Sequence, residues 1–136
     1  ADMIAADGNV RVVIKEFPIF GAGSDYAARA ALAANKQGKY WELHAALFKQ
    51  ESQVTPEIVD SVAESLGIDV AAMKRDMDTD DIKAVILANQ ELAKSLRIEG
   101  TPAFIVDQVV VPGYVPVAAL ADHIKTVRTS GGCKLC

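Results

Sequence analysis

Cysteine is almost absent from this chain, and the two that it has, Cys133 and Cys136, stand together at its end. A disulfide framework needs several cysteines spread along a short chain, so this sequence does not contain one. At 136 residues and 51% hydrophobic content, the chain suits one domain with enough apolar surface for a hydrophobic core.

Positive charge is also in deficit, with 14 Lys and Arg against 18 Asp and Glu and a formal net charge of −4. Without a basic stripe, nucleic acid is not an expected partner. No apolar run approaches the roughly 18 residues that suggest a membrane span, so none is predicted in this chain. A signal peptide is absent as well, but a chain that starts inside a predicted helix does not show whether one was removed.

Hydrophobic periodicity predicts a strand, a helical block, a hairpin and a closing helix. Residues 10–17 alternate in the manner of a strand, with both faces apolar as in a strand covered by helices on each side. Residues 24–97 are predicted to be almost entirely helical, because apolar residues recur at helical spacing between clear start and stop signals. The start signals are Ser24, Thr55-Pro56 and Asp69.

The hairpin is predicted from Ala103–Val106 and Val109–Val111 with Asp107-Gln108 as its turn, and Pro116 is predicted to open the last helix. The resulting fold class is α/β, a sheet with a helical insertion. We expect one domain over residues 1–128 and a flexible, cysteine-containing tail over residues 129–136.

Thr101-Pro102 opens the first hairpin strand directly after a helix and Gly100. Proline lacks the backbone N–H that a strand residue donates to its neighbouring strand. It is nevertheless tolerated at the first residue of a strand. The bond is either an ordinary trans joint or a cis bond, which costs far less before proline than elsewhere. A cis bond would expose the main chain of Thr101 at the surface.

Besides the order of elements, five segments of the sequence are informative together: Lys15–Gly21, Ala27–Ala34, Gln37–Trp41, His44–Phe48 and Gly100–Phe104. With this order of elements, they resemble the DsbA-like branch of the thioredoxin superfamily, and the resemblance runs from about residue 1 to residue 128. The resemblance implies a thioredoxin-like sheet with a DsbA-like helical insertion, in which Thr101 and Pro102 form the loop that pairs its main chain with an extended substrate peptide.

The activity that the resemblance implies is thiol:disulfide exchange with secreted proteins through a mixed disulfide. Its partners would be unfolded or partly folded secreted proteins and a redox partner protein, in the periplasm or another extracytoplasmic compartment. No cofactor and no metal are expected. The alternative is a thioredoxin-like peptide-binding or chaperone module that keeps the Thr-Pro groove and has no reactive pair.

One departure from the family is serious, because members carry a Cys-x-x-Cys at the end of a first strand, where a helix opens. Ala1–Asp7 looks like the tail of that helix, so the strand and both cysteines are expected upstream of Ala1. In the family arrangement that strand is central. We therefore expect Val10–Phe17 and Ala103–Val106 not to pair directly, and to be bridged by a strand outside residues 1–136.

Cys133 and Cys136 have the spacing of a redox dithiol and are the only candidates in this chain for catalytic thiols. No helix follows them to lower a thiol pKa, and Gly131-Gly132 leaves them poorly held. A metal-binding or inter-chain pair, a tail disulfide and an incidental addition are the alternatives. We predict that this pair is not the catalytic centre of the family reaction.

Lys15 is a possible modulator of the thiol pKa, or a lysine whose head group reaches water at a strand end. Glu16 is a weak candidate for a buried relay acid. His44 lies on an apolar helical stripe with no carboxylate in helical register, which favours a hydrogen-bonded core residue, and His123 is expected near solvent. Neither histidine supports a nucleophilic triad.

Overall fold

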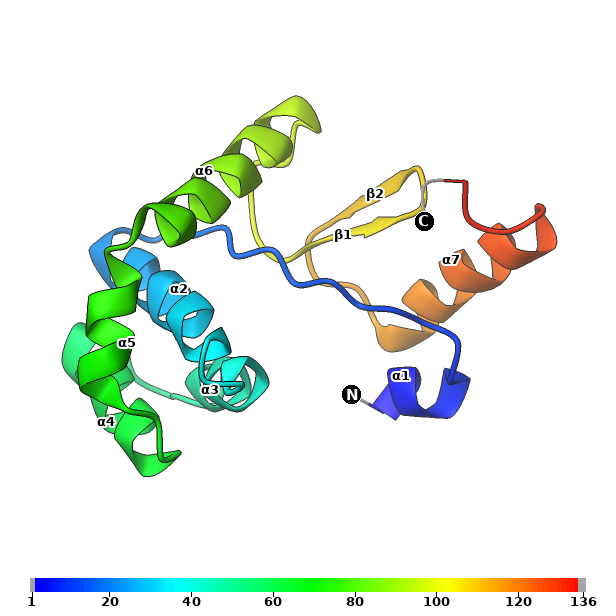
Figure 1. Ribbon diagram of the computed structural model, residues 1–136. Helices are drawn as coiled ribbons and strands as arrows, with labels where there is room; N and C mark the ends of the chain where they lie inside the picture. Colours follow the sequence, from blue (N-terminus) through cyan, green and yellow to red (C-terminus); the bar gives the residue numbers. More distant parts are fainter. Residues whose placement is uncertain (1, 135–136) are drawn as a thin grey trace. The chain divides into compact units, whose positions relative to one another are not determined.

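The structure is a computed structural model that describes residues 2–134, with side chains described from residue 4 onward. Figure 1 labels its elements along the chain. They are α1 (Asp2–Asp7), α2 (Ala22–Asn35), α3 (Tyr40–Leu47), α4 (Pro56–Ser65), α5 (Val70–Met77), α6 (Asp80–Ser95), β1 (Ala103–Val106), β2 (Val109–Pro112) and α7 (Val117–Thr129).

The chain divides into two compact units. The helical unit is Glu16–Leu92, and the hairpin unit joins Ala1–Lys15 to Ala93–Cys136. Together they give the helix-rich α/β architecture, with a small antiparallel sheet, that the sequence predicts. None of the helices in the described part of the chain is long and apolar enough to cross a membrane.

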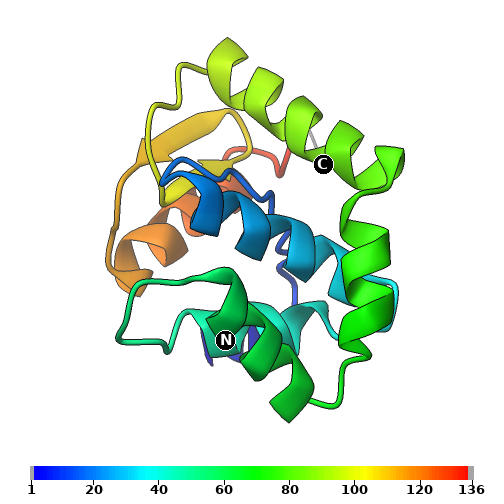
Figure 2. The same cartoon turned by 90° about the vertical axis from the view of Figure 1, so that its left-hand side faces the viewer.

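The core of the helical unit forms around α2, which packs against α3, α4 and α5 (Figure 2). Small alanine side chains on α2 let its neighbours approach closely, and Ala30, Ala33 and Ala34 are fully buried. Leu43 of α3 and Met73 of α5 are also completely buried against this cluster. Burial of these side chains is the main favourable contribution to the stability of the unit.

Local capping fixes where two of these helices begin, as predicted. The hydroxyl of Thr55 accepts a hydrogen bond from the backbone N–H of Ile58 at 3.4 Å, and Pro56 occupies the first helical position. The carboxylate of Asp69 accepts from the N–H of Ala72 at 2.9 Å and starts α5.

The predicted cap at Ser24 is wrong, because α2 already begins at Ala22. Gly21 precedes the helix with φ 81°, a left-handed conformation that glycine adopts without strain. The chain therefore turns into the helix earlier, and Ser24 lies inside the first turn. Gly23 passes so close to the carbonyl of Val54 that a side-chain carbon at this position would collide with that oxygen.

The hairpin of the second unit has the predicted position. β1 and β2 pair antiparallel, with Ala103 opposite Pro112 and Val106 opposite Val109. Asp107 opens the two-residue turn with φ 55°, in the left-handed region that short hairpin turns require. α7 packs against β1, and it begins directly after Pro116 as expected.

The prediction of a strand at Val10–Phe17 is wrong for the described structure, in which residues 10–19 are in no strand. A strand is defined by hydrogen bonds to a neighbour, and within residues 2–134 the sheet contains β1 and β2 alone. The expectation that this segment does not pair with β1 is therefore met. The bridging strand stays a prediction.

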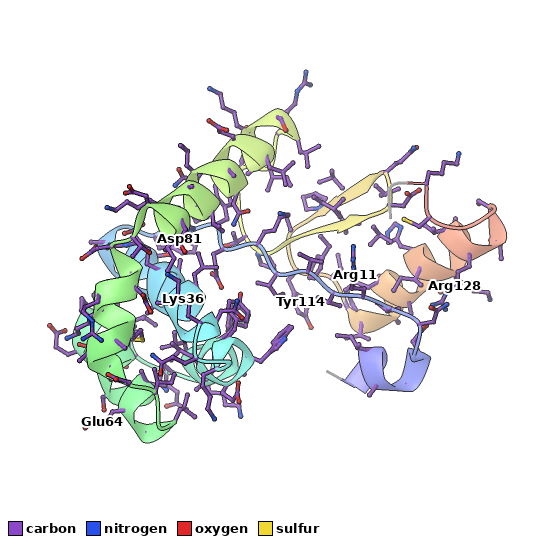
Figure 3. All side chains as sticks on the ribbon, in the orientation of Figure 1. Arg11, Lys36, Glu64, Asp81, Tyr114 and Arg128 are labelled. Atoms are coloured by element: carbon purple, nitrogen blue, oxygen red, sulfur yellow. The ribbon has the colours of Figure 1, made fainter. Side chains whose placement is uncertain are left out.

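An ion pair joins the two ends of the hairpin unit. Arg128 of α7, labelled in Figure 3, donates from Nη1 to Oδ2 of Asp7 at 2.8 Å and from Nη2 to the carbonyl of Asn9 at 2.9 Å. A bidentate guanidinium fixes direction as well as distance. α1 is therefore held to the last turn of α7 by polar contacts at the surface.

Candidate functional site

The Thr101–Pro102 bond is cis, which confirms the cis alternative of the sequence prediction. The chain leaves α6 through Arg97, whose φ of 56° is left-handed, while the N–H of Ile98 donates to the carbonyl of Ala93 at 2.8 Å. This closing turn ends the helix and directs the chain through Gly100 into β1.

Thr101 and Pro102 are both exposed at the surface of the hairpin unit, immediately before the first residue of β1. Within the described residues β1 is paired on one edge, by β2, and its other edge has no strand beside it. An extended peptide can bind exposed main chain through hydrogen bonds with little demand on its side-chain sequence, and at the Thr101–Pro102 loop this does not require the edge of β1 where the bridging strand is predicted. The loop therefore has the accessibility that such peptide binding requires.

Lys15 is exposed at the end of the extended segment that follows α1. This position suits the alternative in which its ammonium group reaches water. Its role as a modulator of a thiol pKa stays a prediction.

Glu16 is the shared partner in a polar cluster of the helical unit, and the sequence does not predict these contacts. The hydroxyl of Tyr40 donates to its Oε1 at 2.5 Å, and Nδ1 of His44 lies 3.3 Å from the same oxygen. His44 is therefore hydrogen-bonded, as the sequence favours, although its partner is a carboxylate outside helical register. A carboxylate was sought only at helical spacing, and the actual partner comes from another segment, 28 residues earlier in the chain.

The Glu16 cluster links the start of the helical unit to α3 and α6 of the same unit. The side chains of Glu16 and His44 are only 16% and 18% exposed, and the amide of Asn89 on α6 donates to the Glu16 carbonyl at 3.0 Å. Burial, and then the hydrogen bond to Glu16, raises the pKa of Tyr40 well above its ordinary value of 10.0. Tyr40 therefore stays protonated and acts as a donor, which indicates a structural role.

Aromatic rings surround this cluster. Tyr40 stacks on His44 with ring centroids 5.4 Å apart, and Phe48 lies 4.9 Å from His44 on the other side. His123 lies on α7 of the hairpin unit and is partly exposed. Among the described residues, no group of three or more His, Cys, Asp or Glu side chains is arranged to hold a metal ion.

Cys133 is exposed and disulfide-bonded, and its Sγ lies 3.4 Å from Oδ1 of Asp107 in the hairpin turn. Cys136 lies outside the described residues. Asp107 and Thr101 stand at opposite ends of β1. The structure thus places the tail cysteine beside the hairpin turn, whereas the Thr101–Pro102 loop lies at the start of the strand.

Comparison with known families matches residues 2–125 of the chain to the DSBA-like thioredoxin domain. Among curated proteins, the probable disulfide bond formation protein D of Bacillus cereus is 28% identical over 109 residues, covering 74% of this chain and 50% of that protein. The chain therefore spans about half the length of the curated relatives that it matches.

Solved structures agree with this assignment. A thioredoxin-like oxidoreductase from Silicibacter pomeroyi DSS-3 is 41% identical with a TM-score of 0.92, covering 94% of this chain and 74% of that one. A periplasmic thioredoxin-like protein from Salmonella enterica serovar Typhimurium is 26% identical with a TM-score of 0.75, covering 92% and 70%. These relatives have the helix-rich thioredoxin-like fold described above.

Proposed function

The chain belongs to the DSBA-like thioredoxin domain family, and we propose that it supplies the substrate-binding part of an extracytoplasmic thiol:disulfide oxidoreductase. The single observation that carries this proposal is the exposure of the Thr101–Pro102 loop at the surface, immediately before β1. Family membership supports the reaction class, and the exposed loop supports the proposed place of substrate binding.

The proposed substrate is an extended segment of an unfolded or partly folded secreted protein. Its backbone would pair with the main chain beside Thr101, and hydrogen bonds to the backbone give affinity for many sequences. Such breadth suits an enzyme that must act on many substrates while their chains are still flexible.

The proposed chemistry is thiol:disulfide exchange. A substrate thiolate attacks an enzyme disulfide, one enzyme sulfur leaves as a thiolate, and a mixed disulfide forms. The second substrate thiol then displaces the remaining enzyme sulfur, so that two electrons pass from the substrate to the enzyme. A separate redox partner protein would reoxidise the enzyme. The reacting pair is proposed to be the Cys-x-x-Cys that the family carries ahead of the segment at residues 10–17, with Lys15 as a modulator of its pKa.

An extracytoplasmic location is supported by the Salmonella relative, which is described as periplasmic. Disulfide formation is also tolerated mainly outside the reducing cytosol. The second candidate function is a peptide-binding or chaperone module without a reactive pair. The exposed Thr101–Pro102 loop supports this candidate as well, since peptide binding at the loop needs no thiol.

A binding experiment tests peptide binding at the Thr101–Pro102 loop, which both candidate functions require. The protein isolated from its natural source is titrated into a fluorescently labelled, unfolded polypeptide whose thiols are reduced and alkylated. Pro102→Ala should weaken binding about tenfold, because losing one or two main-chain hydrogen bonds of about 1 kcal/mol each costs about that much. Pro116→Ala, which changes an exposed proline of the same unit, is the matched control and should bind as the parent does.

Equal binding by the Pro102→Ala and Pro116→Ala variants would show that the loop is not the substrate site. Two further measurements then separate the enzyme from the module. An intact mass near 14.5 kDa and no acceleration of insulin reduction would favour the module. A heavier protein that accelerates insulin reduction would favour the oxidoreductase.

A further inference from the structure

Asn89 is the one buried polar residue in the part of the chain that the structure describes, with 7% of its surface exposed. It lies on α6, in a stripe whose other members are the buried side chains Ile82, Ile86 and Ala93. A buried amide costs free energy unless it is hydrogen-bonded, and Nδ2 of Asn89 donates to the carbonyl of Glu16 at 3.0 Å. The polar residue in this apolar stripe therefore serves one specific contact.

That contact falls where the extended segment enters the helical unit, at Glu16. Residues 10–17 carry apolar side chains on both faces and belong to no strand in the described structure. Hydrophobic burial alone therefore opposes a shift of this segment along its axis only weakly. Hydrogen bonds oppose it directly, because Tyr40 donates to the side chain of Glu16 and Asn89 donates to its carbonyl. Asn89 thus fixes the register of the segment against α6.

α6 leads from the core of the helical unit to the Thr101–Pro102 loop. Its first turn is held at the end of α2, where Oδ2 of Asp81 lies 3.1 Å from Nζ of Lys36 (Figure 3). At 1.5 Å per residue, Asn89 lies about 12 Å beyond Asp81 and Ser95 lies about 21 Å beyond it. A tilt of the helix about its first turn therefore moves its end nearly twice as far as it moves Asn89.

We propose that Asn89 is a positioning residue of the Thr101–Pro102 loop. By holding Glu16, it prevents α6 from tilting, so that the closing turn of the helix presents the main chain beside Thr101 in one orientation. A loop fixed in this way binds an extended polypeptide at a lower cost in conformational entropy. This inference rests on the proposed function and adds a residue that acts on the loop through α6, without touching the polypeptide.

Titration of the labelled, unfolded polypeptide with two variants of α6 tests this role. Asn89→Leu keeps the size of the side chain and removes the donor. It should weaken binding about fivefold, which corresponds to the loss of about one main-chain hydrogen bond. Ile82→Val shortens a buried side chain of the same helix and leaves the amide in place, so it is the matched control and should bind as the parent does.

Hydrogen exchange of the unbound variants distinguishes a positioning role from a general loss of structure. Asn89→Leu should speed exchange severalfold in the main chain of residues 98–104, while exchange in α2 to α5 stays as slow as in the parent. A merely structural role would speed exchange in α2 to α5 as well. If Asn89→Leu does not fold, Asn89→Ala replaces it, because this variant removes the amide without adding a larger apolar group.

Pro102→Ala, measured beside these variants, separates this inference from the proposed function. If Pro102→Ala weakens binding and Asn89→Leu does not, Asn89 has no positioning role. Equal weakening by Asn89→Leu and Ile82→Val, or faster exchange throughout α2 to α5 in Asn89→Leu, would overturn the inference too. If neither Pro102→Ala nor Asn89→Leu weakens binding, the proposed function fails together with the inference.

Discussion

The helical unit and the hairpin unit differ most in what they bury. Ten residues of the helical unit form one buried cluster, and several of them are completely inaccessible to solvent. Among the described residues, the hairpin unit contributes only Ala93 and Val111 to the buried apolar side chains, while Val13 and Ile105 remain 61% and 47% exposed.

This difference indicates that the helical unit contributes most of the stability, whereas the hairpin unit carries the proposed binding loop. A unit with its own core can be stable by itself, whereas a two-stranded hairpin with one helix has little buried surface to oppose its conformational entropy. The Thr101–Pro102 loop belongs to the hairpin unit. Sites that bind partners are commonly found on the less stable parts of a fold, because those parts keep accessible main chain.

The largest expected effect comes from removing a core side chain of the helical unit. Leu43→Ala should lower the free energy of unfolding by about 3 kcal/mol, because it deletes buried methyl groups and leaves a cavity. Ile105→Ala in the hairpin unit should lower it by less than about 1 kcal/mol, because that side chain is half exposed. Urea unfolding followed by circular dichroism measures both. Equal losses would show that the two units share one core.

Substitution of one glycine in each unit compares the packing of the helical unit with that of the hairpin unit. Gly23→Ala should cost about 2 kcal/mol, because its new methyl group would collide with the carbonyl of Val54 beside α2. Gly100→Ala meets no atom within 4 Å and should change the free energy of unfolding by less than about 0.5 kcal/mol. The same urea experiment distinguishes them, and a neutral Gly23→Ala would contradict the close approach of α2 to the loop at Val54.

A tyrosine pair tests the polar cluster of the helical unit. Tyr40→Phe should cost about 1 to 2 kcal/mol, because the largely buried carboxylate of Glu16 loses its donor. Tyr114→Phe in the hairpin unit removes a hydroxyl from a side chain that is 82% exposed and should be neutral. Thermal unfolding of the two variants under identical conditions measures the difference. A neutral Tyr40→Phe would show that Glu16 is satisfied by other groups.

The smallest expected effect is a pH dependence in the hairpin unit. The hydrogen bonds donated by Arg128 hold the pKa of Asp7 below its ordinary value of 3.8. A lowered folded pKa means that the pair stabilises the fold fully above about pH 4, and that this contribution is lost as pH falls through the folded value.

An Asp7→Asn variant should therefore be slightly less stable than the parent at pH 7, and the difference should shrink toward pH 2. Asp122→Asn serves as the control, since no such gap is expected for it. The readout is the urea midpoint as a function of pH. A gap that is constant with pH would show that the loss is not electrostatic.

Local signals in the sequence predicted most element boundaries. The caps at Thr55 and Asp69 and the hairpin turn at Asp107 each depend on neighbours within a few residues, and the structure confirms them. The cis bond before Pro102 was one of two alternatives that the residues left open. Gly21 was missed as the start of α2, because a left-handed glycine and a Ser24 cap are both plausible from sequence.

Features that depend on distant segments were not predictable in the same way. The contacts of Glu16 with Tyr40 and His44 join an extended segment to a helix, and no periodicity within either segment reveals them. The prediction of a strand at Val10–Phe17 is wrong for a related reason. Its alternating pattern shows that the segment can be a strand, but only a neighbouring strand can make it one.

Hydrogen exchange, with and without an unfolded polypeptide that lacks free thiols, tests the central claim most directly. The account predicts slow exchange in α2 to α5 that the polypeptide does not change, and new protection confined to the main chain around Gly100–Phe104. New protection in the helical unit instead, or no change around Thr101 at saturating polypeptide, would contradict the assignment of the Thr101–Pro102 loop as the substrate site.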